Sequence, residues 1–272
     1  MPPMDPPDAP PRTNEFHNGI PYLEYLQQIH QVAEPSSYLE IGVDTGQSLA
    51  LAHCPTVAID PAFRIQGSPS HRRSETYLFQ MTSDEFFAGY QLDRYLPAGI
   101  DLAFLDGMHH FEFLLRDFLN AEKYSHASTV ITLHDCYPVN TEMARRETDF
   151  DTRVDEETRW WWAGDVWKLL PILRDHRPDL DITVLDCPPT GLVVIRGLDP
   201  QSRAIQSSYT EILDKYRDLH LDNFGIDRFR NEFHTVDSRT LFEPEALRDF
   251  LTDGLRPATN RPSRSVLLPG TT

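Results

Sequence analysis

The stretch Tyr38-Leu-Glu-Ile-Gly-Val-Asp-Thr-Gly46 decides the fold. It reads as a short apolar strand that contains one acid and runs into two glycines, followed by a helix expected over Gln47 to Ala52. A glycine at Gly42 permits a sharp turn with positive φ, and a glycine at Gly46 lets a ligand approach the backbone closely. The next expected strand, Thr56-Val-Ala-Ile-Asp60, ends in a carboxylate that can hold the two hydroxyls of a ribose. Together these features predict a nucleoside-cofactor site.

The glycine count and the charge of this loop discriminate between nucleoside cofactors. Dinucleotide-binding loops of the form G-x-G-x-x-G press backbone amides against a pyrophosphate, whereas Asp44 stands here where a middle glycine would be. A carboxylate would repel a pyrophosphate, but S-adenosylmethionine carries a sulfonium and no phosphate. The pattern E-x-G-x-x-x-G, from Glu40 to Gly46, resembles the first motif of class I S-adenosylmethionine-dependent methyltransferases. A tight connection between two elements would need the same two glycines, so both interpretations stay open on this motif alone.

Composition excludes several classes of partner. The 272 residues carry 42 acids against 25 Lys and Arg, a formal net charge of -17, and no basic tract, so no nucleic acid is expected as a partner. No run of about 18 apolar residues exists, so no membrane contact is expected either. Three cysteines, Cys54, Cys136 and Cys187, show no C-x-x-C spacing and are expected to be reduced thiols. The chain also lacks a secretory signal pattern at its start, so we expect a cytoplasmic protein.

One α/β domain with additions at both ends is expected. Residues 1–14 form a proline-rich lead that is expected to be disordered, residues 15–200 the cofactor-binding domain, residues 201–255 a helical extension and residues 256–272 a flexible tail. A helix over Pro21 to Val32 is expected to cover the sheet edge near the cofactor.

Strands and helices alternate through the domain, which predicts a parallel, doubly wound sheet. The further strands are expected at Thr76–Gln80, Ile100–Asp106, Ser128–His134, Asp181–Leu185 and Gly191–Ile195, the last two forming an antiparallel hairpin. Helices are expected after a cap at Ser83, along the apolar stripe of Phe111, Leu114, Leu115, Phe118 and Leu119, and over Asp165–His176, Gln201–His220 and Pro244–Leu251. Pro171 is expected to bend or shorten its helix, and residues 137–163 show no periodicity.

Acids and histidines follow two of the expected strands at the point where each ends. Asp106 is followed by Gly107, Met108, His109 and His110, and the next strand runs into His134 and Asp135. Because an open α/β sheet binds ligands at the carboxyl ends of its strands, these side chains are expected to converge on one crevice. Taken singly, Asp106 is equally explained as a helix cap, His134 as a core residue and His110 as an exposed helix residue. Their joint position favours a functional site.

These motifs together resemble one methyltransferase family. D-G-x-H followed by an aromatic residue and Glu112, then H-D after the next strand, is similar to the family that includes cephalosporin-hydroxylase-like and macrolide-sugar O-methyltransferases. The later Gly164-Asp-Val-Trp-Lys168 is similar to bacterial members associated with glycan biosynthesis, and the resemblance covers about residues 36–197. It implies a Rossmann-like, seven-stranded sheet whose last strand is inserted antiparallel. It also implies cofactor-binding roles for Glu40, Gly42, Gly46 and Ser48 at the methionine part, Asp60 at the ribose, Thr82 and Ser83 at the adenine, and Asp106.

The same resemblance implies a metal and a base. Relatives often bind magnesium through an acid after the fourth strand and an acidic pair after the fifth, which Asp106 and Asp135 match. His134 replaces the first acid of that pair, and magnesium prefers oxygen ligands, so this departure leaves the metal open. Methyl transfer to a hydroxyl needs a base, for which His109 is the first candidate and His134 the second. The tryptophans at 160–162 and Trp167 are expected either to wall the acceptor or to be ordinary core aromatics.

The sequence therefore predicts an S-adenosylmethionine-dependent O-methyltransferase acting on a sugar, a glycan or another hydroxylated metabolite. Its expected partners are a small-molecule or glycan acceptor and a second copy in a homodimer, with Mg²⁺ as a possible second cofactor. A catalytically silent cofactor-binding partner protein would share every cofactor residue. A nicotinamide-dependent oxidoreductase would share the sheet, but Asp44 and the missing glycine argue against it. A side chain at Gly42 is expected to fill the space that the methionine moiety needs.

Overall fold

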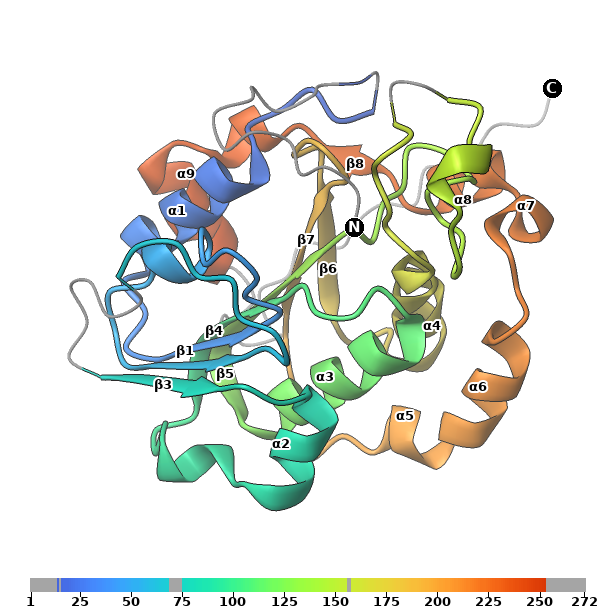
Figure 1. The fold of residues 1–272 in the computed structure, drawn as a ribbon. Coiled ribbons are helices and arrows are strands. Elements are labelled where there is room, and N and C mark those ends of the chain that lie inside the picture. The colour runs from blue at the N-terminus through green and yellow to red at the C-terminus, as the bar shows by residue number, and fades with distance from the viewer. Residues whose placement is uncertain (1–13, 15, 69–74, 156–157, 253–272) are drawn as a thin grey trace, which may run out of the picture.

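A central sheet of eight strands carries the predicted parallel core (Figure 1). The computed structural model describes residue 14 and residues 16–68, 75–155 and 158–252, so most of the predicted lead, residues 69–74 and 156–157, and the predicted tail lie outside the described residues. The strand order is β3-β2-β1-β4-β5-β7-β6-β8. The strands are β1 Tyr38–Ile41, β2 Thr56–Ile59, β3 Thr76–Phe79, β4 Ile100–Leu105, β5 Ser125–His134, β6 Asp181–Leu185, β7 Leu192–Arg196 and β8 Thr235–Val236.

Strand directions confirm the predicted topology. Strands β1 to β5 run parallel to their neighbours, and β7 is antiparallel to both β5 and β6, between which it is inserted. The sheet exceeds the seven expected strands because β8, which comes from the C-terminal extension, pairs parallel with β6. The register places Ile41 opposite both Ile59 and Leu105, and Leu105 opposite Leu133. The residues that follow these four strand ends therefore lie in one row.

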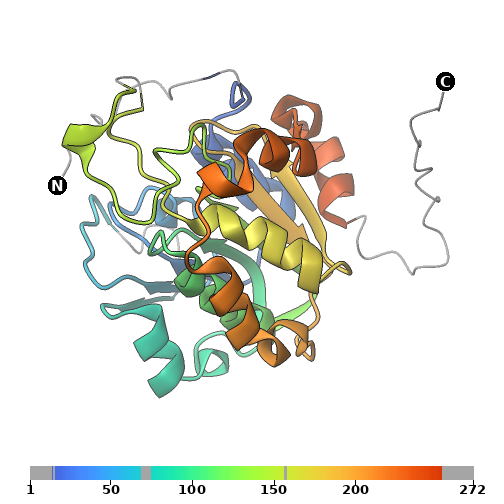
Figure 2. The ribbon, with the colours of Figure 1, turned by 90° about the vertical axis from the view of Figure 1, so that its right-hand side faces the viewer.

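Helices cover both faces of the sheet (Figures 1 and 2). One face carries α1 Tyr22–Ala33 and α9 Pro244–Thr252, which pack together through the buried Leu26, Ile29, Leu247 and Leu251. The other face carries α2 Ser83–Gly89, α3 Phe111–Lys123, α4 Leu169–His176, α5 Ala204–Ser207, α6 Tyr209–Tyr216, α7 Leu221–Phe224 and α8 Ile226–Glu232. The predicted stripe of α3 is buried against the sheet at Phe111, Leu114, Leu115 and Phe118. Within the described residues, no helix is both long and apolar enough to cross a bilayer.

The expected helix from Gln47 to Ala52 is wrong. The chain makes only a short 3₁₀ helix, η1, over Leu49–Leu51. The connection from Ile41 to Thr56 begins as a loop with positive φ at Gly42, Asp44 and Gly46, and the extended conformation at Ala52 ends the turn. Strand β1 and its glycine loop are thus followed by the three-residue η1 and not by an α-helix.

Three other helix predictions need correction. Thr82, not Ser83, caps α2, because Thr82 and Glu85 form a capping box in which each side chain bonds the other's backbone N–H. The helix expected from Asp165 begins as a 3₁₀ turn, η4 Val166–Lys168, and Pro171 then occupies the first turn of α4, where an absent N–H costs little. The single helix expected over Gln201–His220 is divided into α5 and α6. The break comes at Ser208, whose backbone leaves the helical region.

Candidate functional site

A cavity of about 540 Å³ lies at the carboxyl ends of β1, β2, β4 and β5. Its volume is typical of small-molecule sites, and its position is that expected for an open α/β sheet. It is lined by Ile41, Gly42, Asp44, Ile59, Asp60, Pro61, Thr82, Ser83, Asp106, Gly107, Met108, His109, Phe113, Asp117, His134 and Asp135. Most of the predicted site residues therefore meet in one space.

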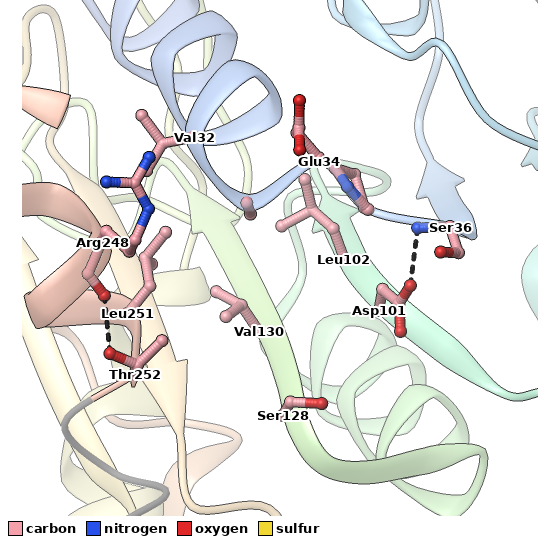
Figure 3. A pocket seen from close by; sticks show the side chains of 12 residues that line it. Val32, Glu34, Ser36, Asp101, Leu102, Ser128, Val130, Arg248, Leu251 and Thr252 are labelled. Atoms are coloured by element: carbon pink, nitrogen blue, oxygen red, sulfur yellow. Dashed lines mark hydrogen bonds between the residues drawn. The ribbon is translucent and has the colours of Figure 1, made fainter. Parts of the chain in front are cut away.

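A second hollow, of about 400 Å³, lies at the opposite edge of the sheet (Figure 3). Its acid, Asp101, accepts a hydrogen bond from the backbone N–H of Ser36 at 2.6 Å and lies 2.7 Å from Nε2 of His126. The side chains from β4, β5, α1 and α9 that surround it are both apolar, as Leu102 and Val130 are, and polar, as Arg248 is. Because it is at the amino ends of β4 and β5, it is separate from the row of strand-end residues.

Gly42 allows the loop after β1 to pack closely against the backbone that follows β4. Its φ of +85° is a conformation that L side chains rarely adopt, and a Cβ there would lie 2.0 Å from the carbonyl oxygen of Asp106. The expectation that a larger side chain at Gly42 would fill the cofactor's space is therefore wrong in its cause. Such a side chain would strike the backbone of Asp106 and Gly107. Gly46 also has a positive φ, but it faces Ile65 and does not line the cavity.

Asp60 organises the loop after β1. Its Oδ2 accepts hydrogen bonds from the backbone N–H groups of Val43 at 2.7 Å and Asp44 at 2.9 Å, and its Oδ1 accepts one from Ala62 at 2.7 Å. A carboxylate has about four lone-pair sites, so three are in use and one is left for a ligand. Asp60 lines the cavity, and its predicted contact with a ribose stays a prediction, limited to one hydrogen bond in this geometry.

The other residues predicted at the methionine part lie beneath the cavity. Glu40 is fully buried, and its Oε1 accepts a hydrogen bond from Oγ of Ser48 at 2.7 Å. Neither residue lines the cavity, so of the four residues predicted there only Gly42 does. Asp44 does line it, with φ +47°, and its carboxylate is paired with Arg64 at 2.5 Å. The charge of Asp44 is therefore offset, which weakens the electrostatic case against a pyrophosphate.

Asp106, His109, His134 and Asp135 form one cluster at the other end of the cavity. Nε2 of His109 lies 3.2 Å from Oδ2 of Asp135 and 3.7 Å from Oδ1 of Asp106. Nδ1 of His134 lies 3.4 Å from Oδ2 of Asp106 and 3.6 Å from Oδ1 of Asp135. Two carboxylates thus stand between two imidazoles.

A backbone carbonyl sets the tautomer of the neutral His109 ring. Its Nδ1 lies 2.7 Å from the carbonyl oxygen of Trp162, which can only accept a hydrogen bond, so Nδ1 carries the hydrogen. In the neutral ring the lone pair is therefore on Nε2, which points to the acids. Behind the ring, Asp165 donates its backbone N–H to the His109 carbonyl at 3.1 Å, and Gly164 packs against the same group. The loop 162–165 thus holds His109 in place.

His134 has a different environment. Its ring is buried and stacks on Tyr22 with 4.0 Å between ring centroids, and its Nε2 lies 3.3 Å from Oγ1 of Thr190. Thr190 donates its own hydrogen to Asp135 at 2.6 Å, so it can accept one from His134. Burial disfavours the charged ring, but the carboxylates of Asp135 and Asp106 outweigh it and raise the pKa of His134 to about 9. A ring that already holds its proton at neutral pH is a poor base, which favours His109.

Tyr22 and Thr190 were not predicted at the site. Tyr22 is the first residue of α1, and its position on the apolar face gave it the appearance of an ordinary core residue. Burial, with the nearby carboxylates of Asp106 and Asp135, raises the pKa of its hydroxyl. Thr190 follows the turn between β6 and β7 and reaches the site only because β7 is inserted beside β5.

The Gly164–Lys168 motif contacts the start of α3, beside the cavity. Asp165 accepts a hydrogen bond from the backbone N–H of Phe111 at 2.8 Å, so it caps α3 and not the helix that follows it. Its Oδ2 contacts the buried Lys168 at 2.7 Å and Arg146 at 3.2 Å. Arg146 also pairs with Glu112 through two hydrogen bonds. The motif therefore fixes the start of α3, from which His109 extends.

None of the four tryptophans lines the cavity. Trp167 is fully buried against Phe224 and Phe229, so it is a core residue and not part of an acceptor wall. Trp162 packs beside His109 with 5.4 Å between ring centroids and is the tryptophan nearest to the expected role.

The strand-end cluster offers donors for a cation. Asp106 and Asp135 each present one carboxylate oxygen and His134 one ring nitrogen, which binds a cation only after it loses its proton, and these atoms lie within 4.8 Å of one another. The set is two carboxylate oxygens and one imidazole nitrogen. Magnesium prefers oxygen ligands, whereas imidazole suits divalent transition metals. The donors therefore fit a manganese-like ion better than magnesium.

No protein-family model matches the chain, and no curated protein matches it. Among solved structures, it is similar to a methyltransferase of Podospora anserina bound to S-adenosylhomocysteine, at 14% identity and a TM-score of 0.46, covering 65% of this chain and 78% of that one. An O-methyltransferase of Bacillus cereus, also bound to S-adenosylhomocysteine, shows 15% identity and a TM-score of 0.44, with coverages of 64% and 79%. An O-methyltransferase of Streptomyces achromogenes involved in tomaymycin synthesis shows 16% and 0.46, with 65% and 80%. These likenesses are too weak to assign an activity.

Proposed function

We propose that the chain is an S-adenosylmethionine-dependent methyltransferase that methylates a hydroxyl of a sugar, a glycan or another small metabolite. The observation that carries the proposal is the single cavity at the carboxyl ends of β1, β2, β4 and β5. One end has a nucleoside-type lining at Asp60, Thr82 and Ser83, and the other end has His109 beside two acids. A cofactor that links a nucleoside to a reactive group suits such a space.

The loop geometry favours S-adenosylmethionine over a dinucleotide. The amides of Val43 and Asp44, which a pyrophosphate would need, already donate to Asp60. The helix whose amino terminus would face that pyrophosphate is reduced to the three residues of η1. S-adenosylmethionine needs neither feature, and the carboxylates of Asp106 and Asp135 would attract its sulfonium.

His109 is the base of the proposed reaction. Its Nδ1 hydrogen is held by Trp162, which leaves Nε2 to take the proton from the acceptor hydroxyl as the oxygen attacks the methyl carbon. The imidazolium formed would be stabilised by Asp135 at 3.2 Å and Asp106 at 3.7 Å. Holding the acceptor in line with the sulfonium methyl would supply much of the remaining rate enhancement.

We also propose a divalent cation as an auxiliary cofactor of the reaction. Asp106, His134 and Asp135 would hold it, and it would polarise the acceptor hydroxyl when bound. The remaining features of the proposal are a cytoplasmic location, consistent with three buried free cysteines, and assembly as a homodimer without nucleic acid or membrane partners.

Turnover tests the proposal. The protein is incubated with S-adenosylmethionine and a panel of free sugars, glycosides and hydroxylated aromatic compounds, and S-adenosylhomocysteine is measured as the product. We expect His109→Ala to lower kcat by about 10²-fold or more while keeping the cofactor affinity and the fold. His126→Ala is the matched control, because His126 also pairs with an acid, Asp101 at 2.7 Å, but on the opposite edge of the sheet.

Two results would count against the proposal. Cofactor binding without product from any acceptor would favour the catalytically silent partner protein. A His109→Ala variant with the wild-type rate would show that another group accepts the proton.

A further inference from the structure

Asp117 is a buried acid with no evident structural partner for one of its oxygens. It is on α3, is 2% exposed and lines the same cavity as the strand-end cluster. Its Oδ1 has no hydrogen-bond partner among the described residues. Leaving a buried acceptor unsatisfied costs about 1–3 kcal/mol, and more for a charged group. A ligand that donates a hydrogen bond to Oδ1 would remove that cost.

The charges near Asp117 do not explain it. Arg116, its neighbour on α3, turns away to pair with Asp84 at 2.6 Å and to donate to Tyr209. Burial raises the pKa of Asp117 to about 7, because the hydrogen bond from Ser83 and the charge of Arg116 only partly offset the burial and Asp84 adds to it. Among the groups that influence it, no cation is paired with Asp117, and above neutral pH it is an acceptor only.

The surroundings of Asp117 suit a flat ring with an amino group. Phe113 lies one turn earlier on α3 and also lines the cavity, as do Thr82 and Ser83 at the start of α2. Gly107 has no side chain to cover the acid, and a Cβ there would lie 3.7 Å from Asp117 Oδ2. An aromatic ring, polar groups and an unsatisfied carboxylate oxygen thus line the same cavity.

We infer that Asp117 selects adenine by accepting a hydrogen bond from the 6-amino group of the base at Oδ1. The inference rests on the proposed function, because adenine is the base of the proposed cofactor. A purine with an oxygen at position 6 would place its own lone pairs against the carboxylate and be rejected. Asp117 would thereby orient the base at one end of the cavity while the sulfonium lies near the strand-end cluster.

Calorimetry with two ligands tests this inference. S-adenosylhomocysteine and S-inosylhomocysteine, which carries the 6-oxo group, are titrated separately into the protein at pH 8.5. We expect the wild type to bind the adenosyl compound about 10- to 100-fold more tightly. Asp117→Asn should reduce this preference by about tenfold or more, because the amide can donate to the 6-oxo group. Asp93→Asn, which removes one exposed acid elsewhere, should keep it.

The outcomes separate this inference from the proposed function. A wild type that binds both compounds equally overturns the role of Asp117 and leaves the cofactor assignment intact. An unchanged preference in Asp117→Asn also overturns it and assigns Asp117 to bracing α2 through Ser83. A wild type that binds neither compound overturns the cofactor assignment and the role of Asp117 with it.

Discussion

Gly164→Ala should disable the proposed base without touching the cofactor end of the cavity. Gly164 does not line the cavity, and its φ is +61°. A Cβ there would lie 1.8 Å from the carbonyl oxygen of His109 and 2.7 Å from its Cβ. Because non-bonded heavy atoms are stable at about 3.5–4.0 Å, the loop and His109 must separate by more than an ångström.

The expected losses follow from the bonds that this separation breaks. His109 would lose the hydrogen bond that its Nδ1 donates to the Trp162 carbonyl and the one that its own carbonyl accepts from Asp165. Two hydrogen bonds and the strain of a left-handed alanine together cost roughly 2–5 kcal/mol of the free energy of unfolding. A displacement of about 1 Å at a catalytic group can lower the rate by about 10²-fold.

Gly67→Ala is the matched control. Gly67 also has a positive φ, +90°, but a Cβ there would meet nothing within 4 Å, so only the strain of about 1–2 kcal/mol applies. Chemical denaturation, calorimetry with S-adenosylhomocysteine and kcat are measured for both variants. We expect Gly164→Ala to be the less stable variant and to lose kcat while it still binds the product. Equal stability and a wild-type kcat in both variants would refute the role given to loop 162–165.

Three further predictions concern burial, charge and metal. Burial raises the pKa of Asp117 from 3.8 to about 7, so the stability that its protonated form contributes is complete below pH 3.8 and is lost as the pH rises to about 7. The wild type should therefore lose stability relative to Asp117→Asn over that range, and a pH-independent difference in denaturation midpoints would contradict this. Arg177→Met should lower the free energy of unfolding by about 3–5 kcal/mol, because it leaves the buried Glu122, which Arg177 contacts at 2.6 Å, without its partner. The double variant that also carries Glu122→Leu should recover most of this loss when both are measured by urea denaturation. Mn²⁺ should raise the Tm more than Mg²⁺ at equal concentration, and His134→Asp should reverse that order; no shift with either ion would exclude the site.

The parts of the fold that were predicted depend on local patterns. The apolar stripe of α3 predicts a helix, and the apolar runs of β4 and β5 predict strands, because burial on one or both faces sets the spacing of apolar residues. The meeting of Asp106, His109, His134 and Asp135 was also predictable, since parallel strands end at one edge.

The parts that were missed depend on contacts between distant segments. Small residues after Gly46 favour a helix locally, but the positive-φ loop before them and the extended conformation at Ala52 leave only a 3₁₀ turn. Asp165 looked like the start of its own helix, and only the packing of the loop shows that it caps α3. The ribose contact of Asp60 stays a prediction, but its position in the sequence did not show that three backbone amides already use its carboxylate. The spacing of apolar residues along the sequence carries no information about such contacts, so they could not be predicted from it.

The identity of the cofactor is tested most directly by calorimetric titration of the wild-type protein with S-adenosylhomocysteine and, separately, with NAD⁺. We predict one site for S-adenosylhomocysteine and none for NAD⁺, because the amides of Val43 and Asp44 are committed to Asp60 and only the three-residue 3₁₀ helix η1 follows the loop. At a ligand concentration of 100 times Kd, the product should also stabilise the fold by about 2.7 kcal/mol. Binding of NAD⁺ with no binding of S-adenosylhomocysteine would contradict the assignment of this cavity to methyl transfer.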